Sequence, residues 1–240
     1  MKSSLCTLLG AAILATGFPA NAQVAPPNPD RGGPPPPPPS GEDIGRRNDD
    51  FWARYDTQLR MKDVNSPESR AGPAAVARCV VSKAKGKAGT LVGGAFTDDP
   101  KYGELMSALQ NKYSRCVDTV AVGLSMDLVN AAVAEELLRV EPPAVPERAT
   151  IADVAAAKAF YVETKGLTIE GIGRCLAVYS PGLAYRVVQT PPASPEESAA
   201  LAAVFAKTPE CGRSAPPAGI APAYQRAAVA TGLYHWTHRG

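Results

Sequence analysis

The chain has 240 residues, of which 45% are hydrophobic and 20% charged, and its formal net charge at pH 7 is +2. A nearly balanced charge excludes strong electrostatic attraction to nucleic acid or to an anionic membrane surface. A chain of this length can bury a substantial hydrophobic core. We therefore expect a globular protein with no nucleic acid among its partners.

The first 22 residues have the pattern of a secretory signal peptide. Lys2 precedes an apolar run over residues 5–18, and an Ala-x-Ala end closes it at Ala22. The run is shorter than the ~20 apolar residues that a spanning helix needs. We predict cleavage after Ala22, an exported protein that is periplasmic or secreted, and no transmembrane segment after cleavage. Without Lys2, 24 basic residues face 23 acidic ones, which leaves a net charge of +1.

Residues 23–41 are rich in proline and include six consecutive prolines at 34–39. Such a run cannot form a helix or an inner strand. We predict a disordered linker with polyproline II character, which acts as a spacer. The alternative is a ligand for an aromatic groove on a partner protein.

Two cysteine-containing stretches of the chain are similar to one another. Arg78-Cys79 recurs 96 positions later as Arg174-Cys175, and Ala-Ala-Val-Ala at residues 131–134 returns letter for letter at 227–230. Between these matches the second copy is shorter by one residue, so that Cys211 follows Cys116 by 95 positions. This pattern indicates an internal repeat. It predicts two units, residues 42–141 and 142–240, which we expect to form one compact domain.

Four of the five cysteines remain after removal of the leader. An even number in an exported chain is typical of a disulfide framework, and four cysteines allow three pairings. The repeat favours one bridge inside each unit, Cys79–Cys116 and Cys175–Cys211, because two copies of a unit should close in the same way. No C-x-x-C motif and no zinc-like spacing of cysteine and histidine are present.

Hydrophobic periodicity near 3.6 and Pro/Gly punctuation predict an all-α fold of two similar, disulfide-closed helical units, without a convincing strand. The expected helices are one with Phe51, Tyr55 and Leu59 on its inner face, one that opens at Gly72-Pro73, one capped by Asp99 before Pro100, one from Met126, one from Thr150, one over residues 173–179, one from Ser194-Pro195 and one over 222–236.

Few residues suggest chemistry. His235 and His238 stand three apart, so that a helix could present both rings to one metal, but two ligands are too few for a metal site. The acidic pair at 135–136 fits a solvated helix face, and the pair at 196–197 fits a helix start. Nucleophile, phosphate-loop and dinucleotide motifs are absent from the sequence. We therefore predict no catalytic residue, no cofactor and no metal.

Arg78 and Arg174 each precede the first cysteine of their unit. An arginine in this place could pair with an acid of a neighbouring helix, or its aliphatic stem could cover the disulfide. A third interpretation is that it anchors a ligand.

Three features are shared by the two units: an Arg-Cys pair, an interval of 36 or 37 residues between the cysteines, and an Ala-Val-Ala helix that closes the unit. In these features the chain resembles uncharacterised exported bacterial proteins with the same twice-repeated unit. The resemblance extends over about residues 74–236. It implies an exported, helical protein and carries no activity, ligand or catalytic residue.

The sequence thus favours a binding or scaffolding module of the bacterial envelope, with an envelope protein or a small ligand as partner. A rival hypothesis is a hydrolase-like enzyme with a site across the two units, which would need a cluster of buried ionisable residues in a pocket. Handling of a metal or small ligand by His235 and His238 is a third.

Overall fold

The computed structural model describes residues 64–94, 100–117, 124–162 and 168–239. Within these ranges the chain is helical and contains no strand, which confirms the all-α prediction. The predicted leader, the linker and the aromatic stripe of Phe51, Tyr55 and Leu59 lie outside the described residues. None of the described helices is both long and apolar enough to cross a bilayer.

The elements follow one another as helices and two short 3-10 turns. They are α2 (Pro67–Ala84), η1 (Ala88–Leu91), α3 (Pro100–Gln110), α4 (Ser114–Val117), α5 (Met126–Val140), α6 (Ile151–Val162), α7 (Ile169–Tyr179), α8 (Pro181–Gln189), α9 (Pro195–Ala206), η2 (Pro209–Cys211) and α10 (Pro222–Thr237).

The start of α2 differs from the prediction that Gly72-Pro73 opens this helix. The helix begins at Pro67, where the Ser66 hydroxyl accepts a hydrogen bond from the backbone N–H of Ser69 at 3.2 Å. Pro73 lies inside the helix. The prediction was wrong because a serine cap followed by proline at the first position is a complete start signal, whereas Pro73 only removes one backbone donor.

Other helix starts follow the cap and proline signals. At α9 the Ser194 hydroxyl accepts from the Glu197 N–H at 3.1 Å, and at α6 Thr150 and Asp153 bond each other's backbone N–H groups. Helix α7 starts at Ile169, earlier than residue 173, because the Thr168 hydroxyl accepts from the N–H of Gly171.

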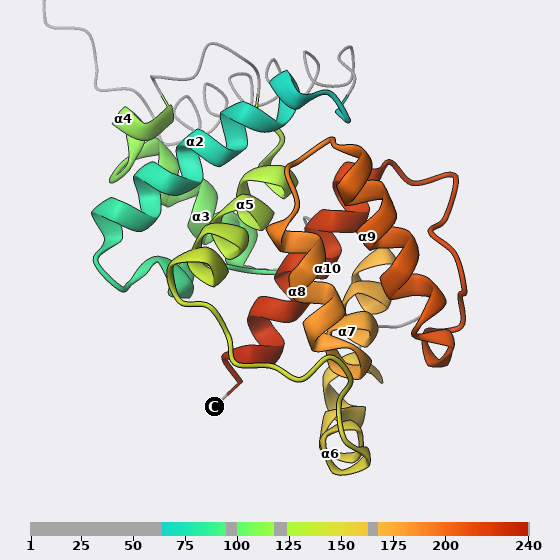
Figure 1. Ribbon diagram of the computed structural model, residues 1–240. Helices are drawn as coiled ribbons and strands as arrows, with labels where there is room; N and C mark the ends of the chain where they lie inside the picture. Colours follow the sequence, from blue (N-terminus) through green and yellow to red (C-terminus); the bar gives the residue numbers. More distant parts are fainter. Residues whose placement is uncertain (1–63, 95–99, 118–123, 163–167, 240) are drawn as a thin grey trace, which may run out of the picture.

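Two helix pairs form the centre of the molecule (Figure 1): α2 packs on α5, and α7 packs on α10. Helix α10 also packs against α5, so that a continuous buried core joins the two halves of the chain. Its fully buried side chains include Val80, Leu105, Leu138, Leu176 and Phe205.

The crossing of α7 and α10 depends on glycine. A Cβ atom built on Gly173 would lie 2.3 Å from the backbone oxygen of Ala228, and one on Gly232 would lie 2.8 Å from the backbone of Gly173. Because real Cβ atoms do not approach so closely, the two helix backbones can pack this tightly only where no side chain intervenes.

Both halves present elements in the same order. Each has a cysteine-bearing helix (α2 or α7), then a helix that begins with proline (α3 or α9), then a second cysteine, then a closing helix (α5 or α10). They differ after the first cysteine, where α2 continues to Ala84 but α7 ends at Tyr179 and α8 follows. The internal repeat and the boundary at residues 141 and 142 remain interpretations of the sequence.

Candidate functional site

A groove of about 510 Å³ opens where the two predicted units meet. We call it the inter-unit groove. Helices α2 and α5 form one side, and α8, the segment after it and α10 form the other. The lining residues are Ala74, Arg78, Ala132, Glu135, Glu136, Arg139, Tyr185, Val188, Gln189, Thr190, Pro191, Pro192 and Arg226.

Arg226 is the most deeply buried charge of the groove. Its side chain is 2% exposed and forms a bidentate ion pair with Glu135, with Nε–Oε1 2.8 Å and Nη2–Oε2 2.9 Å. Nη1 donates to the carbonyl and hydroxyl oxygens of Thr190, and Nη2 donates to the carbonyl of Val188. These contacts engage Nε and both terminal nitrogens, so that Arg226 fixes the end of α8 against α5 and α10.

The charge of Arg226 is secured by the same pair. Burial by itself lowers the pKa of the guanidinium, but the Glu135 carboxylate raises it by charge and hydrogen bonding, Glu197 adds to this, and the net pKa shift is upward. Arg226 therefore stays positively charged over the whole physiological range of pH.

A second buried ion pair lies nearby. Arg70 on α2 donates to Glu197 on α9 at 2.8 Å, and the two side chains are 9% and 2% exposed. The other carboxylate oxygen of Glu197 accepts from the backbone N–H of Ala193, which has φ 61. Glu197 therefore pairs with Arg70 through one oxygen and holds the left-handed backbone at Ala193 through the other. Arg70 and Arg226 thus each join one predicted unit to the other.

Two further arginines line the rim. Arg139 pairs in bidentate fashion with Glu136 on the same helix, at 2.8 and 2.5 Å. Arg78 is exposed and makes no ion pair with a described residue. Of the three interpretations of Arg78, pairing with an acid of a neighbouring helix is therefore not seen in the described part of the chain.

Arg174 differs from Arg78. Its Nη2 donates to Glu170, one turn earlier on α7, at 2.7 Å, and its guanidinium lies 5.5 Å from the ring centre of Phe160 on α6. The predicted acid partner is thus found on the same helix and not on a neighbouring one. Arg174 helps to attach α6 to α7 and lies outside the inter-unit groove.

The disulfides join the predicted partners. Cys79 is bonded to Cys116 and Cys175 to Cys211, with Cα–Cα separations of 5.6 and 5.7 Å. Two such bonds indicate folding in an oxidising compartment. Each closes one half of the molecule. The first bond attaches the segment after α3 to α2, and the second attaches the segment after α9 to α7.

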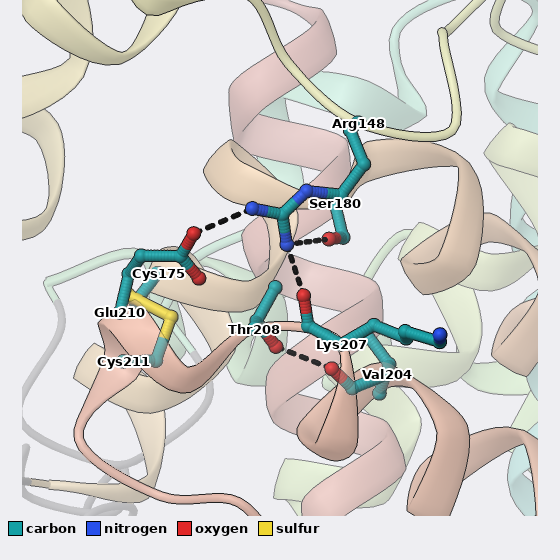
Figure 2. The surroundings of a disulfide bond; sticks show 8 residues. All are labelled: Arg148, Cys175, Ser180, Val204, Lys207, Thr208, Glu210 and Cys211. Carbon is teal, nitrogen blue, oxygen red and sulfur yellow. Dashed lines mark hydrogen bonds and ion pairs between the residues drawn. A yellow bond between two sulfur atoms is a disulfide. The ribbon is translucent and has the colours of Figure 1, made fainter.

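Arg148 stabilises the surroundings of the second disulfide (Figure 2). Its guanidinium donates to Ser180 Oγ at 3.2 Å, to the carbonyl of Lys207 and to Glu210. Thr208 donates to the carbonyl of Val204 beside it. Arg148 belongs to the segment between α5 and α6, so one side chain ties this connection to the end of α7 and to the turn that carries Cys211.

The two histidines do not meet at one point. His235 Nε2 lies 2.9 Å from the carbonyl of Gly93, whereas His238 Nδ1 lies 2.9 Å from the carbonyl of Tyr234 and its ring stacks on that tyrosine. No group of three or more metal-ligating side chains forms within residues 64–94, 100–117, 124–162 and 168–239.

A smaller cavity of about 300 Å³ lies near the end of α10. The connection before α6 and the residues Pro181, Trp236 and Arg239 line it. Its walls come mainly from the second half of the chain, and we call it the α10 cavity.

Sequence reasoning missed the buried ion pairs. Glu135 was assigned to a solvated face and Glu197 to a helix start, but Glu135 is only 22% exposed and Glu197 is buried. Both assignments were incomplete because the arginine partners are 91 and 127 positions away in the chain. One signal was available: Arg226 directly precedes the apolar run 227–230, where a charge on a packed helix requires a partner.

Comparison of the chain with models of known protein families, with curated proteins and with solved structures finds no match.

Proposed function

We propose that the protein is an exported binding module of the bacterial envelope and that the inter-unit groove is its ligand site. The observation that carries the proposal is the groove itself, with a volume of about 510 Å³ and walls from both halves of the chain. Ligand pockets in proteins have volumes of about 300–1,000 Å³ and are usually present before the ligand binds.

The groove is held in shape by covalent and ionic contacts. A disulfide closes each half, and the Arg226–Glu135 and Arg70–Glu197 pairs connect them. A site that is ordered before binding loses little conformational entropy when the ligand arrives. This rigidity supports recognition of a ligand by a fixed surface.

The lining residues favour binding over catalysis. No histidine, cysteine, serine, lysine or aspartate is among the described residues that line the groove, and its hydroxyl groups are those of Tyr185 and Thr190. The Thr190 hydroxyl donates to the carbonyl of Val187 and accepts from Arg226. The two glutamates of the groove are each held by an arginine in bidentate contact. A general base or nucleophile needs a free atom within reach of the substrate, so this geometry gives the hydrolase hypothesis little support.

The proposed location is the periplasm or the extracellular space. The signal-like residues 1–22 and the two disulfides support it. N-terminal sequencing of the protein from a producing cell should find Gln23 first. Retention of Met1 or Lys2 in the mature protein would contradict export by a cleaved signal.

A retrieval experiment tests the ligand site. The mature protein, immobilised, is exposed to an envelope extract beside the variants Ala132→Trp and Gln189→Trp, which place a large side chain in the groove. Ala203→Trp, on the exposed face of α9, is the control. We expect the wild type and the control to retain the same molecule and both groove variants to lose it. Equal retention by all four proteins would contradict a site in the groove.

A further inference from the structure

The charges that line the inter-unit groove do not cancel. Three arginines and two glutamates are present, namely Arg78, Arg139, Arg226, Glu135 and Glu136. Arg226 occupies both oxygens of Glu135, and Arg139 occupies both oxygens of Glu136. One positive charge, that of Arg78, is therefore left without compensation by the described residues of the groove.

The position of Arg78 makes this charge available to a ligand. Arg78 is exposed, and it lies one helical turn after Ala74 on the same face of α2. Both residues line the groove, and its lining also includes the apolar side chains of Ala132, Val188 and Pro192. An arginine at the rim of an apolar surface can bind a carboxylate or sulfonate through two parallel hydrogen bonds.

We propose that the inter-unit groove binds an amphipathic monoanion, with its single acidic group on Arg78 and its apolar body against Ala132, Val188 and Pro192. The inference rests on the proposed function and specifies the class of ligand. A cationic ligand would meet three arginines and no free carboxylate. A second acidic group would have to compete with Glu136 for Arg139.

A pair of probes that differ in charge tests the proposal. Anilinonaphthalene sulfonate carries one negative charge on an apolar body, and phenylnaphthylamine is the same body without the charge. Both increase in fluorescence on entering an apolar site, so that each can be titrated with the natively folded protein. We expect the sulfonate to bind more tightly than the neutral probe.

Two variants locate the effect. Arg78→Gln removes the charge and should weaken binding of the sulfonate by about tenfold or more, the loss expected for a charge-assisted hydrogen bond, while the neutral probe is unaffected. Arg115→Gln, an exposed arginine outside the groove, is the matched control and should change neither titration. Arg78→Lys should recover part of the sulfonate affinity, because it restores the charge but not the bidentate geometry.

The two proposals fail in different ways. If Arg78→Gln leaves sulfonate binding unchanged while Ala132→Trp blocks both probes, the groove binds apolar molecules and the inference about a monoanion is wrong. If neither Ala132→Trp nor Gln189→Trp affects either probe, the groove is not a binding site, and both proposals are overturned.

Discussion

Asn130 on α5 and Arg226 on α10 stand 96 positions apart, and each bonds backbone groups of its own half: Asn130 those of the segment after η1, and Arg226 those at the C-terminal end of α8. The Asn130 amide nitrogen donates to the carbonyls of Gly93 and Gly94 at 3.2 and 2.6 Å, and its oxygen accepts from the Gly93 N–H at 3.1 Å. Arg226 donates to the carbonyls of Val188 and Thr190 at 2.8 and 3.0 Å. A buried polar side chain thus satisfies backbone groups that no helix pairs.

Replacement of Arg226 should strongly destabilise the protein. Arg226→Met leaves Glu135 without its partner in a mostly buried place and removes donors from two carbonyls, a loss that we expect to cost about 3–5 kcal/mol in the free energy of unfolding. Urea denaturation measures it. The double variant Arg226→Met/Glu135→Leu should recover part of the loss, and simple additivity of the two single losses would contradict a direct pair.

Asn130→Ala should also destabilise, but by less. It removes three hydrogen bonds from a neutral side chain and leaves buried polar groups unpaired, for which we expect about 2–3 kcal/mol. Hydrogen exchange should show the loss at the Gly93 amide, whose acceptor disappears. Unchanged protection of that amide would mean that Asn130 does not hold the loop.

Gly232→Ala tests the close contact of α7 and α10. The added methyl group would lie 2.8 Å from the backbone of Gly173, so the helices must separate, which we expect to cost about 1–3 kcal/mol. Gly103→Ala on α3 is the control because its Cβ would meet nothing within 4 Å. That change should stabilise by up to about 1 kcal/mol through higher helix propensity. Equal effects of the two substitutions on the thermal unfolding midpoint would contradict the tight crossing.

The disulfides should be inaccessible in the native state and important for stability. Cys116→Ser opens a bridge between residues 37 apart, and Cys211→Ser opens one between residues 36 apart; each should lower the free energy of unfolding by about 2–5 kcal/mol. Peptide mapping without reduction should find Cys79 joined to Cys116 and Cys175 to Cys211. A peptide that joins Cys79 to Cys175 would contradict two separately closed halves.

Local signals predicted much of the fold. Ser194-Pro195, Thr150 and the proline at residue 100 stand at helix starts in the structure because caps and proline act within one turn of chain. The same rule, applied to Ser66-Pro67, would have placed the start of α2 correctly. The pairing of cysteines followed from the similarity of the two halves.

The groove could not be predicted in this way. Glu135 and Arg226 are neighbours only because α5 packs against α10, and the sequence pattern of a single helix does not specify which helices pack together. Arg78 shows the same limit. Its place before Cys79 suggested three roles, and only the packing of the helices shows that Arg78 lines the inter-unit groove, where both glutamates are paired with other arginines.

The central claim is that ligands bind between the two halves, and chemical-shift mapping by nuclear magnetic resonance tests it most directly. The isotope-labelled mature protein is titrated with anilinonaphthalene sulfonate, and the backbone amide shifts are followed. We predict the largest changes at Ala74, Ala132 and Gln189, which line the inter-unit groove. Largest changes around Val145 and Trp236 at the α10 cavity, with Ala132 and Gln189 unmoved, would contradict the claim.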